Sequence, residues 1–212
     1  VTITRMEAGA PYVSEINGED VEDIENGWQH VSDDLDAAAE GDVITVEMNG
    51  VSVLPGNVID NIKGKNITVE LDMGNGVIWT INGKNITATT VEDVDLKVDL
   101  NTMNIPVEVI NKITGEISTM QISLAHDGDF GYKAFMRINL DAANAGYYAQ
   151  LFHYEEASKV LKYMNQSKID AAGYVELPFT HASEYTIVID DVAYQVPGSG
   201  GSSAPAATPT PA

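Results

Sequence analysis

The sequence predicts an α+β protein of two lobes, a small α/β unit followed by an antiparallel β-sandwich. Residues 1–90 place strand-like runs on both sides of a short helical segment. From Val94 onward, short runs of β-branched and aromatic residues alternate with turns. Of the 212 residues, 44% are hydrophobic, which is enough to bury one large or two small cores. We therefore expect lobes at residues 1–90 and 91–196.

The first predicted element is a helix within "NGWQHVSDDLDAAAEG". Asn26 is the expected N-cap, and Gly41 ends the segment. Trp28, Val31 and Leu35 follow helical spacing on one stripe. This spacing favours a core position for Trp28 over a role in ligand binding.

A strand, a short helix and a second strand follow, in "DVITVEMNG", "LPGNVIDNIKG" and "NITVELDMG". A crossover of this length implies a parallel strand pair. The turn signals Gly74-Asn75-Gly76 and Asn82-Gly83 then flank a strand that contains Trp79. These elements make the small α/β unit with a βαβ crossover.

The second lobe is expected to contain only strands. Short apolar runs separated by turns are typical of antiparallel sandwiches. The runs are "VDLKVDL", "IPVEVIN", "STMQISLAH", "YKAFMRINL", "YYAQLFHYE", "KVLKYMN", "GYVELPF", "EYTIVID" and "VAYQV".

Charge and composition exclude several classes of function. The chain has 11 Lys and Arg against 32 Asp and Glu, a net charge of −21, which repels nucleic acid and anionic membranes. Without cysteine it has no thiolate zinc site, thiol nucleophile or disulfide. Neutral ligands, cations and basic protein surfaces remain as partners.

No motif indicates catalysis, a metal or a cofactor. None of the four histidines forms a metal-binding helix motif, and no nucleophile elbow surrounds Ser183 in "HASE". A structural hydrogen-bonding role is expected for His181 and Ser183. The acidic turn "HDGDFG" lacks the EF-hand pattern, which favours a solvated turn over a calcium site.

The chain ends in "GSGGSSAPAATPTPA", the composition of a flexible linker between modules. We interpret residues 197–212 as a linker to neighbouring modules; a cloning remnant is the alternative. Such a linker favours a piece of a secreted multimodular protein.

The segments "GKNITVELDMGNGVIWTINGKNIT", "ISLAHDGDFGYKAFMRINLD", "NAGYYAQLFHYEE" and "GYVELPFTHASEYTIVID" resemble an extracellular module of cell-surface, dockerin- or scaffoldin-linked proteins of ruminococci and related gut Firmicutes. The resemblance covers residues 25–190. Similar modules include the starch-adherence proteins of ruminococcal amylosomes, in which a two-lobed module grips α-1,4-glucan. The resemblance implies a non-catalytic, cell-surface protein and transfers no binding residue.

Candidate sugar-binding residues follow from strand alternation, because sugars stack on aromatic rings and hydrogen-bond to polar side chains. In "YKAFMRINL", alternation places Phe135 and Arg137 opposite the core; a first lobe that covers Phe135 is the alternative. In "YYAQLFHYEE" both faces are aromatic. Trp79 is a further stacking candidate, with a core position as the alternative. The candidate residues are Trp79, Phe135, Arg137, Tyr148, Gln150 and Tyr154.

We therefore expect a non-catalytic module that binds starch-type α-1,4-glucan through exposed aromatic residues. The alternative is a structural spacer or a protein-interaction module beside a dockerin or scaffoldin unit. The alternative for the strand at 147–156 is burial on both sides, which would remove Tyr148, Gln150 and Tyr154 from the surface.

Overall fold

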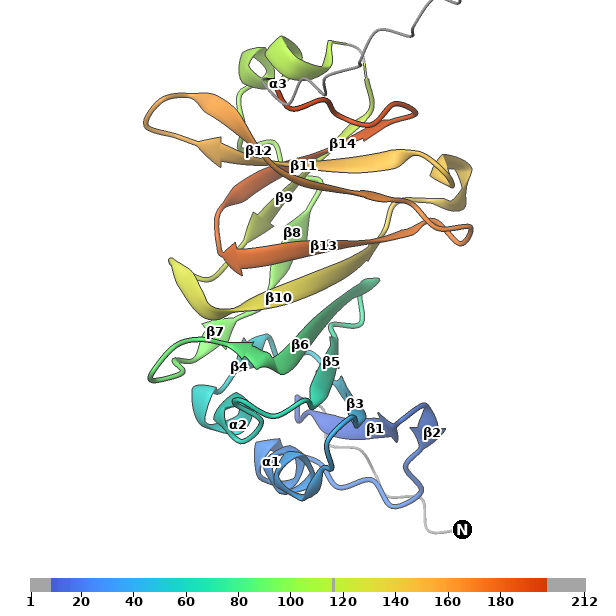
Figure 1. Ribbon diagram of the computed structural model, residues 1–212, viewed down its shortest axis with the longest axis vertical. Helices are drawn as coiled ribbons and strands as arrows, with labels where there is room; N and C mark the ends of the chain where they lie inside the picture. Colours follow the sequence, from blue (N-terminus) through green and yellow to red (C-terminus); the bar gives the residue numbers. More distant parts are fainter. Residues whose placement is uncertain (1–8, 116, 198–212) are drawn as a thin grey trace, which may run out of the picture.

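The computed structural model describes residues 9–115 and 117–197. Two sheets form a sandwich-like arrangement and a third, two-stranded sheet lies beside them. The seven-stranded sheet has the order β13-β10-β6-β5-β3-β1-β2, and the five-stranded sheet has the order β12-β11-β14-β9-β8. Figure 1 shows α1 and α2 at one end of the long axis and α3 at the other.

The seven-stranded sheet is formed by β1 (Tyr12–Ile16), β2 (Glu19–Asp20), β3 (Val43–Glu47), β5 (Thr68–Asp72), β6 (Val77–Ile86), β10 (Asp129–Asn139) and β13 (Tyr174–His181). The five-stranded sheet is formed by β8 (Val98–Leu100), β9 (Thr119–Leu124), β11 (Tyr148–Glu155), β12 (Val160–Lys168) and β14 (Glu184–Asp190). The remaining elements are β4 (Val53–Leu54), β7 (Val94–Asp95), α1 (Trp28–Ala37), α2 (Gly56–Asp60), α3 (Val107–Thr114) and η1 (Ala142–Asn144).

The first predicted elements are present. The strands β3 and β5 pair in parallel, with β4 and α2 between them in the chain. Helix α1 buries Val31 and Leu35, and Trp28 packs partly buried against the same core. The predicted cap is wrong, because the helix begins after Gly27, at φ 113°, without a side-chain cap. A left-handed backbone of this kind suits glycine.

The sheets do not divide at residue 90. Strands β10 and β13 come from the second predicted lobe, yet they extend the sheet that β1, β3, β5 and β6 form. One hydrophobic cluster joins α1 and α2 to inward residues of both sheets, with Leu35, Trp79, Met136 and Ile187 among its members. The core is therefore continuous across the predicted boundary.

The second half is not all-β. "IPVEVIN" belongs to helix α3 and the residues that precede it, and "VAYQV" forms no strand. Helix α3 follows Pro106 and ends at Gly115, with Glu108 in its first turn and Lys112 in its last. These are ordinary helix signals that override the β-branched composition.

The predicted turn at Asn82-Gly83 lies inside β6 instead of between strands. Gly83 is held by its neighbours: its amide donates to the Ile67 carbonyl, and its carbonyl accepts from the Gly64 amide. A β-carbon at residue 83 would lie 1.9 Å from the Ile62 carbonyl oxygen, so only glycine fits. Of the predicted linker, residues 198–212 lie outside the described part of the chain.

Candidate functional site

Strand β10 presents alternating faces, as its sequence predicts. Ala134, Met136 and Ile138 are at most 1% exposed and face the core. Phe135 and Arg137 are half-buried on the other side of the sheet, and Lys133 beyond them is exposed. We call this outward side of the seven-stranded sheet the open face, since its side chains remain partly exposed on every strand from β3 to β13.

Cross-strand pairing builds the open face around Phe135 and Arg137. Phe135 lies opposite Thr80 of β6 and Pro178 of β13. Arg137 lies opposite Ile78 and Glu176 on the same two strands. The register therefore surrounds an aromatic ring and a guanidinium with hydroxyl, carboxylate and apolar groups.

Arg137 is positioned by two contacts. Its guanidinium carbon lies 4.0 Å from the centre of the Tyr174 ring, and its Nη2 lies 3.7 Å from Oδ2 of Asp170. The Tyr174 amide donates a 2.9 Å hydrogen bond to Asp170, and this bond, with the nearby Arg137, lowers the pKa of the Asp170 carboxyl. The Arg137 side chain is still 41% exposed, so its donors remain accessible to a ligand.

The far end of the open face is acidic. Glu47 and Asp72 are paired across β3 and β5, and Tyr12 lies opposite Glu47 on β1. Partial burial, reinforced by Asp72 and Glu15, raises the pKa of Glu47. Burial, followed by the charges of Glu47 and Asp72, also raises the pKa of the Tyr12 hydroxyl. The open face thus changes from acidic at β1–β5 to aromatic and cationic at β10.

Trp79 belongs to the core, which corrects its prediction as a stacking residue. It is 0% exposed, and its ring lies edge-on to Phe130 and Phe179. Its indole Nε1 donates to the Leu96 carbonyl at 3.0 Å. A buried tryptophan with a satisfied N–H has no surface to offer a ligand.

Gln150 and Tyr154 are also buried, because both faces of β11 are covered. Gln150 is 3% exposed and donates to the Val192 carbonyl at 2.8 Å. Tyr154 is 8% exposed and packs with Val109 and Ile110 of α3. The prediction of these two residues as ligand contacts is therefore wrong for this structure. The covering elements are α3 and the C-terminal segment 191–196.

Tyr148 is half-buried at the start of β11, in the five-stranded sheet. The Lys168 ammonium lies 5.8 Å from the centre of the Tyr148 ring. The Tyr148 backbone pairs with Lys168 on β12 and with Asp190 on β14. Of the predicted residues, Phe135 and Arg137 are therefore brought onto one face, while Tyr148 lies on another sheet.

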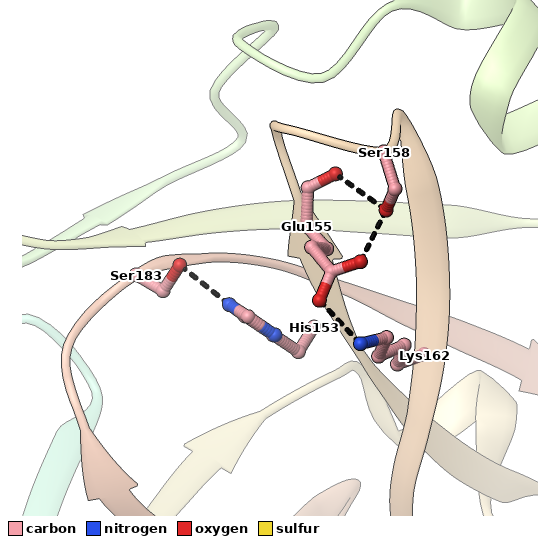
Figure 2. Close-up of polar contacts among 5 residues, drawn as sticks. All are labelled: His153, Glu155, Ser158, Lys162 and Ser183. Atoms are coloured by element: carbon pink, nitrogen blue, oxygen red, sulfur yellow. Dashed lines mark hydrogen bonds and ion pairs between the residues drawn. The ribbon is translucent and has the colours of Figure 1, made fainter.

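A second polar cluster surrounds His153 (Figure 2). Its Nε2 lies 2.8 Å from the Ser183 hydroxyl, which ties β11 to the turn between β13 and β14. Burial, followed by the neighbouring His181 ring, lowers the pKa of His153. Glu155 of β11 bonds to Ser158 and Lys162 across the β11–β12 hairpin. These contacts fasten strands together, in keeping with a structural role.

No metal site or membrane helix is found in the described ranges. Residues 9–115 and 117–197 contain no group of three or more His, Asp or Glu side chains suited to hold a metal ion. Within the same ranges, no helix is long and apolar enough to cross a bilayer. Comparisons with protein-family models, curated proteins and solved structures find no match to this chain.

Sequence reasoning missed the neighbours that complete the open face, above all Tyr174 and Glu176. Alternation in "GYVELPF" could have placed them outward, because Val175, Leu177 and Phe179 are the buried set. Only the register of β13 against β10 places them beside Arg137.

Proposed function

We propose that the protein is a non-catalytic carbohydrate-binding module whose open face binds a glycan. The observation behind this is the half-buried Phe135 ring beside the Arg137 guanidinium on an uncovered sheet. A pyranose presents C–H bonds that pack on an aromatic ring, and its hydroxyls accept hydrogen bonds from guanidinium groups and donate them to carboxylates. Glu176 and Asp170 supply such carboxylates next to Arg137.

Starch-type α-1,4-glucan is the ligand that we propose, on the strength of the sequence resemblance. A partly exposed sheet face favours a polysaccharide over a small metabolite, since it offers several shallow contacts along neighbouring strands. Single-site affinity would be weak and would be raised by linked copies in a cell-surface, multimodular protein. Neighbouring modules would be attached through the Gly/Ser/Thr/Pro-rich segment 197–212.

The test is affinity electrophoresis in gels cast with amylopectin, xyloglucan or a soluble cellulose derivative. We expect the wild-type protein to be retarded by amylopectin, and Phe135→Ala and Arg137→Ala to run faster than the wild type in that gel. Tyr147→Ala is the control, because this ring is 42% exposed and lies outside the seven-stranded sheet. If Phe135→Ala and Arg137→Ala are retarded as strongly as Tyr147→Ala, the assignment of glycan binding to the open face is contradicted.

A protein-interaction module is the second candidate, and an apolar groove beside α3 favours it. Val109, Ile113 and Val160 line a cavity of about 200 Å³ between α3 and the β11–β12 hairpin. Val107 and Met103 nearby in sequence are 66% and 91% exposed. Unchanged mobility in the amylopectin gel would contradict starch binding, and unchanged mobility in every gel would favour this candidate.

A further inference from the structure

A cavity of the open face lies where β10 leaves its neighbours. Between Tyr132 and Ala134, the partner residues on β6 jump from Ile86 to Ile81, so β6 bulges away. On the other side, the partners jump from His181 to Phe179 while β10 advances from Asp129 to Ala134. Bulges of this kind re-aim side chains beside binding sites. The cavity between the displaced strands measures about 470 Å³.

The wall of this cavity is fixed by the backbone. The Gly131 carbonyl accepts hydrogen bonds from the amides of Thr87 and Ala88, at 3.1 and 2.9 Å. Gly131 has a φ of 78°, and a β-carbon there would lie 2.7 Å from the Ala88 β-carbon. The loop after β6 is therefore held against β10 at a position that only glycine allows.

The charge of the lining is opposite to the charge of the chain. Two basic residues, Lys84 and Lys133, line the cavity with a single acidic residue, Asp129. Neither lysine ammonium has an ion-pair or hydrogen-bond partner among residues 9–115 and 117–197; the Lys84 backbone amide donates to Oδ1 of Asn82. The lining has a formal charge of +1 in a protein with 11 basic and 32 acidic residues.

A second cavity of similar size shows the contrast. It measures about 460 Å³, lies against the five-stranded sheet and contains one lysine, Lys159, with two carboxylates, Glu156 and Glu184. The formal charge of its lining is −1. The smaller cavity beside α3 is also lined by two lysines, Lys112 and Lys159, but the rest of its lining is apolar. The cavity between the bulged strands combines its two lysines with the polar side chains of Asn85, Thr87 and Thr180.

We propose that the cavity between β6, β10 and β13 binds a small oxyanion, a carboxylate or a phosphate. Lys84 and Lys133 supply charge-assisted hydrogen bonds, and the hydroxyl of Thr180 and the amide of Asn85 supply neutral ones. The oxyanion is either a free small molecule or a charged substituent of a glycan on the open face, because Lys133 and Phe135 lie on the same side of β10. The inference stands whether or not the open face binds glycan.

The test is a titration of the ¹⁵N-labelled protein followed by amide chemical shifts, at pH 7 and constant ionic strength. The probes are sodium phosphate, sodium glucuronate, neutral methyl glucoside and a sodium chloride control. We expect saturable shifts at residues 84–87 and 129–133 with phosphate or glucuronate, and none there with methyl glucoside or chloride. Tighter binding of glucuronate than of phosphate would identify an acidic sugar as the source of the anion.

Variants that lack one lysine distinguish anion binding at this cavity from a general attraction of anions to surface lysines. Lys84→Ala and Lys133→Ala should each weaken the affinity for the anion about fivefold or more, since each removes one charged donor. Lys159→Ala, at the second cavity, should leave it unchanged. Absence of saturable shifts, shifts equal to those of chloride, or variants that bind as tightly as the wild type would overturn the proposal. Binding of neutral amylopectin by the open face would be unaffected by any of these results.

Discussion

The outward faces of the two sheets differ in how they are covered. Phe135 of β10 and Phe152 of β11 both point away from the main core, yet Phe135 is half-buried and Phe152 is 0% exposed. Tyr194 of the C-terminal segment packs edge-on against Phe152, at 5.2 Å between ring centres. An aromatic residue on the outer face of a strand is therefore available to a ligand only where no later segment covers it.

The largest expected effect comes from the same substitution on the two faces. Phe152→Ala should cost about 3–5 kcal/mol of unfolding free energy, because it empties a fully buried position. Phe135→Ala should cost about 1 kcal/mol or less, because its site is open to solvent. Urea denaturation of both variants measures the difference. Equal losses would break the comparison, since they would show that Phe135 is also a structural residue.

The covering segment provides the next test. Tyr194 stacks on Tyr163 at 4.6 Å and 21°, in addition to its contact with Phe152. Tyr194→Ala should cost about 2 kcal/mol, the sum expected for two aromatic contacts, and should increase the binding of a hydrophobic dye. Tyr147→Ala, which removes an exposed ring, should cost about 0.5 kcal/mol or less. Equal dye binding by the two variants would contradict a covering role for Tyr194.

A pH-dependent effect is expected on the five-stranded side. Because burial and His181 lower the pKa of His153, the unfolded chain takes up a proton at this residue more readily than the folded one. The unfolding free energy should therefore fall as the pH drops from the ordinary histidine pKa of 6.5 towards the lowered pKa of His153. The charge of Glu155 acts in the opposite direction on this pKa and reduces the fall. The fall should be smaller in His153→Gln than in His30→Gln, whose ring is 43% exposed. Urea denaturation at several pH values between 7.5 and 5 measures this fall. If the unfolding free energies of the two variants fall equally with pH, His153 is not the source of the effect.

The smallest effect concerns the covered side of β10. The Tyr132 hydroxyl is buried without a hydrogen-bond partner in the described part of the chain, and its burial raises its pKa. Tyr132→Phe should leave the melting temperature unchanged or raise it by a few degrees, because removal of an unsatisfied buried hydroxyl removes its desolvation cost. A decrease would mean that the hydroxyl has a stabilising partner.

The sequence predicts the local pattern well and the long-range contacts poorly. Alternation correctly assigns Ala134, Met136 and Ile138 to the core, and crossover length correctly predicts the parallel pairing of β3 and β5. The run "IPVEVIN" was misassigned because β-branched residues favour strands, although Pro106 and Gly115 mark a helix. The signals at the ends of the helix outweigh the β-branched composition there.

The candidate site was predicted in part for the same reason. Phe135 and Arg137 could be identified together because they are two residues apart on one strand. The burial of Gln150 and Tyr154 could not be predicted, because it depends on the packing of α3 and of residues 191–196 over β11. Nor could alternation reveal the cavity at Lys84 and Lys133, since it arises from bulges that break the register of three strands.

Glycan binding by the open face can be mapped from the amide chemical shifts of the ¹⁵N-labelled protein on addition of maltoheptaose. We expect saturable shifts concentrated on β6, β10 and β13 around Thr80, Phe135 and Glu176, with β11, β12 and α3 unaffected. Shifts confined to β11, β12 or α3, or no shift at any residue, would contradict the assignment of glycan binding to the open face.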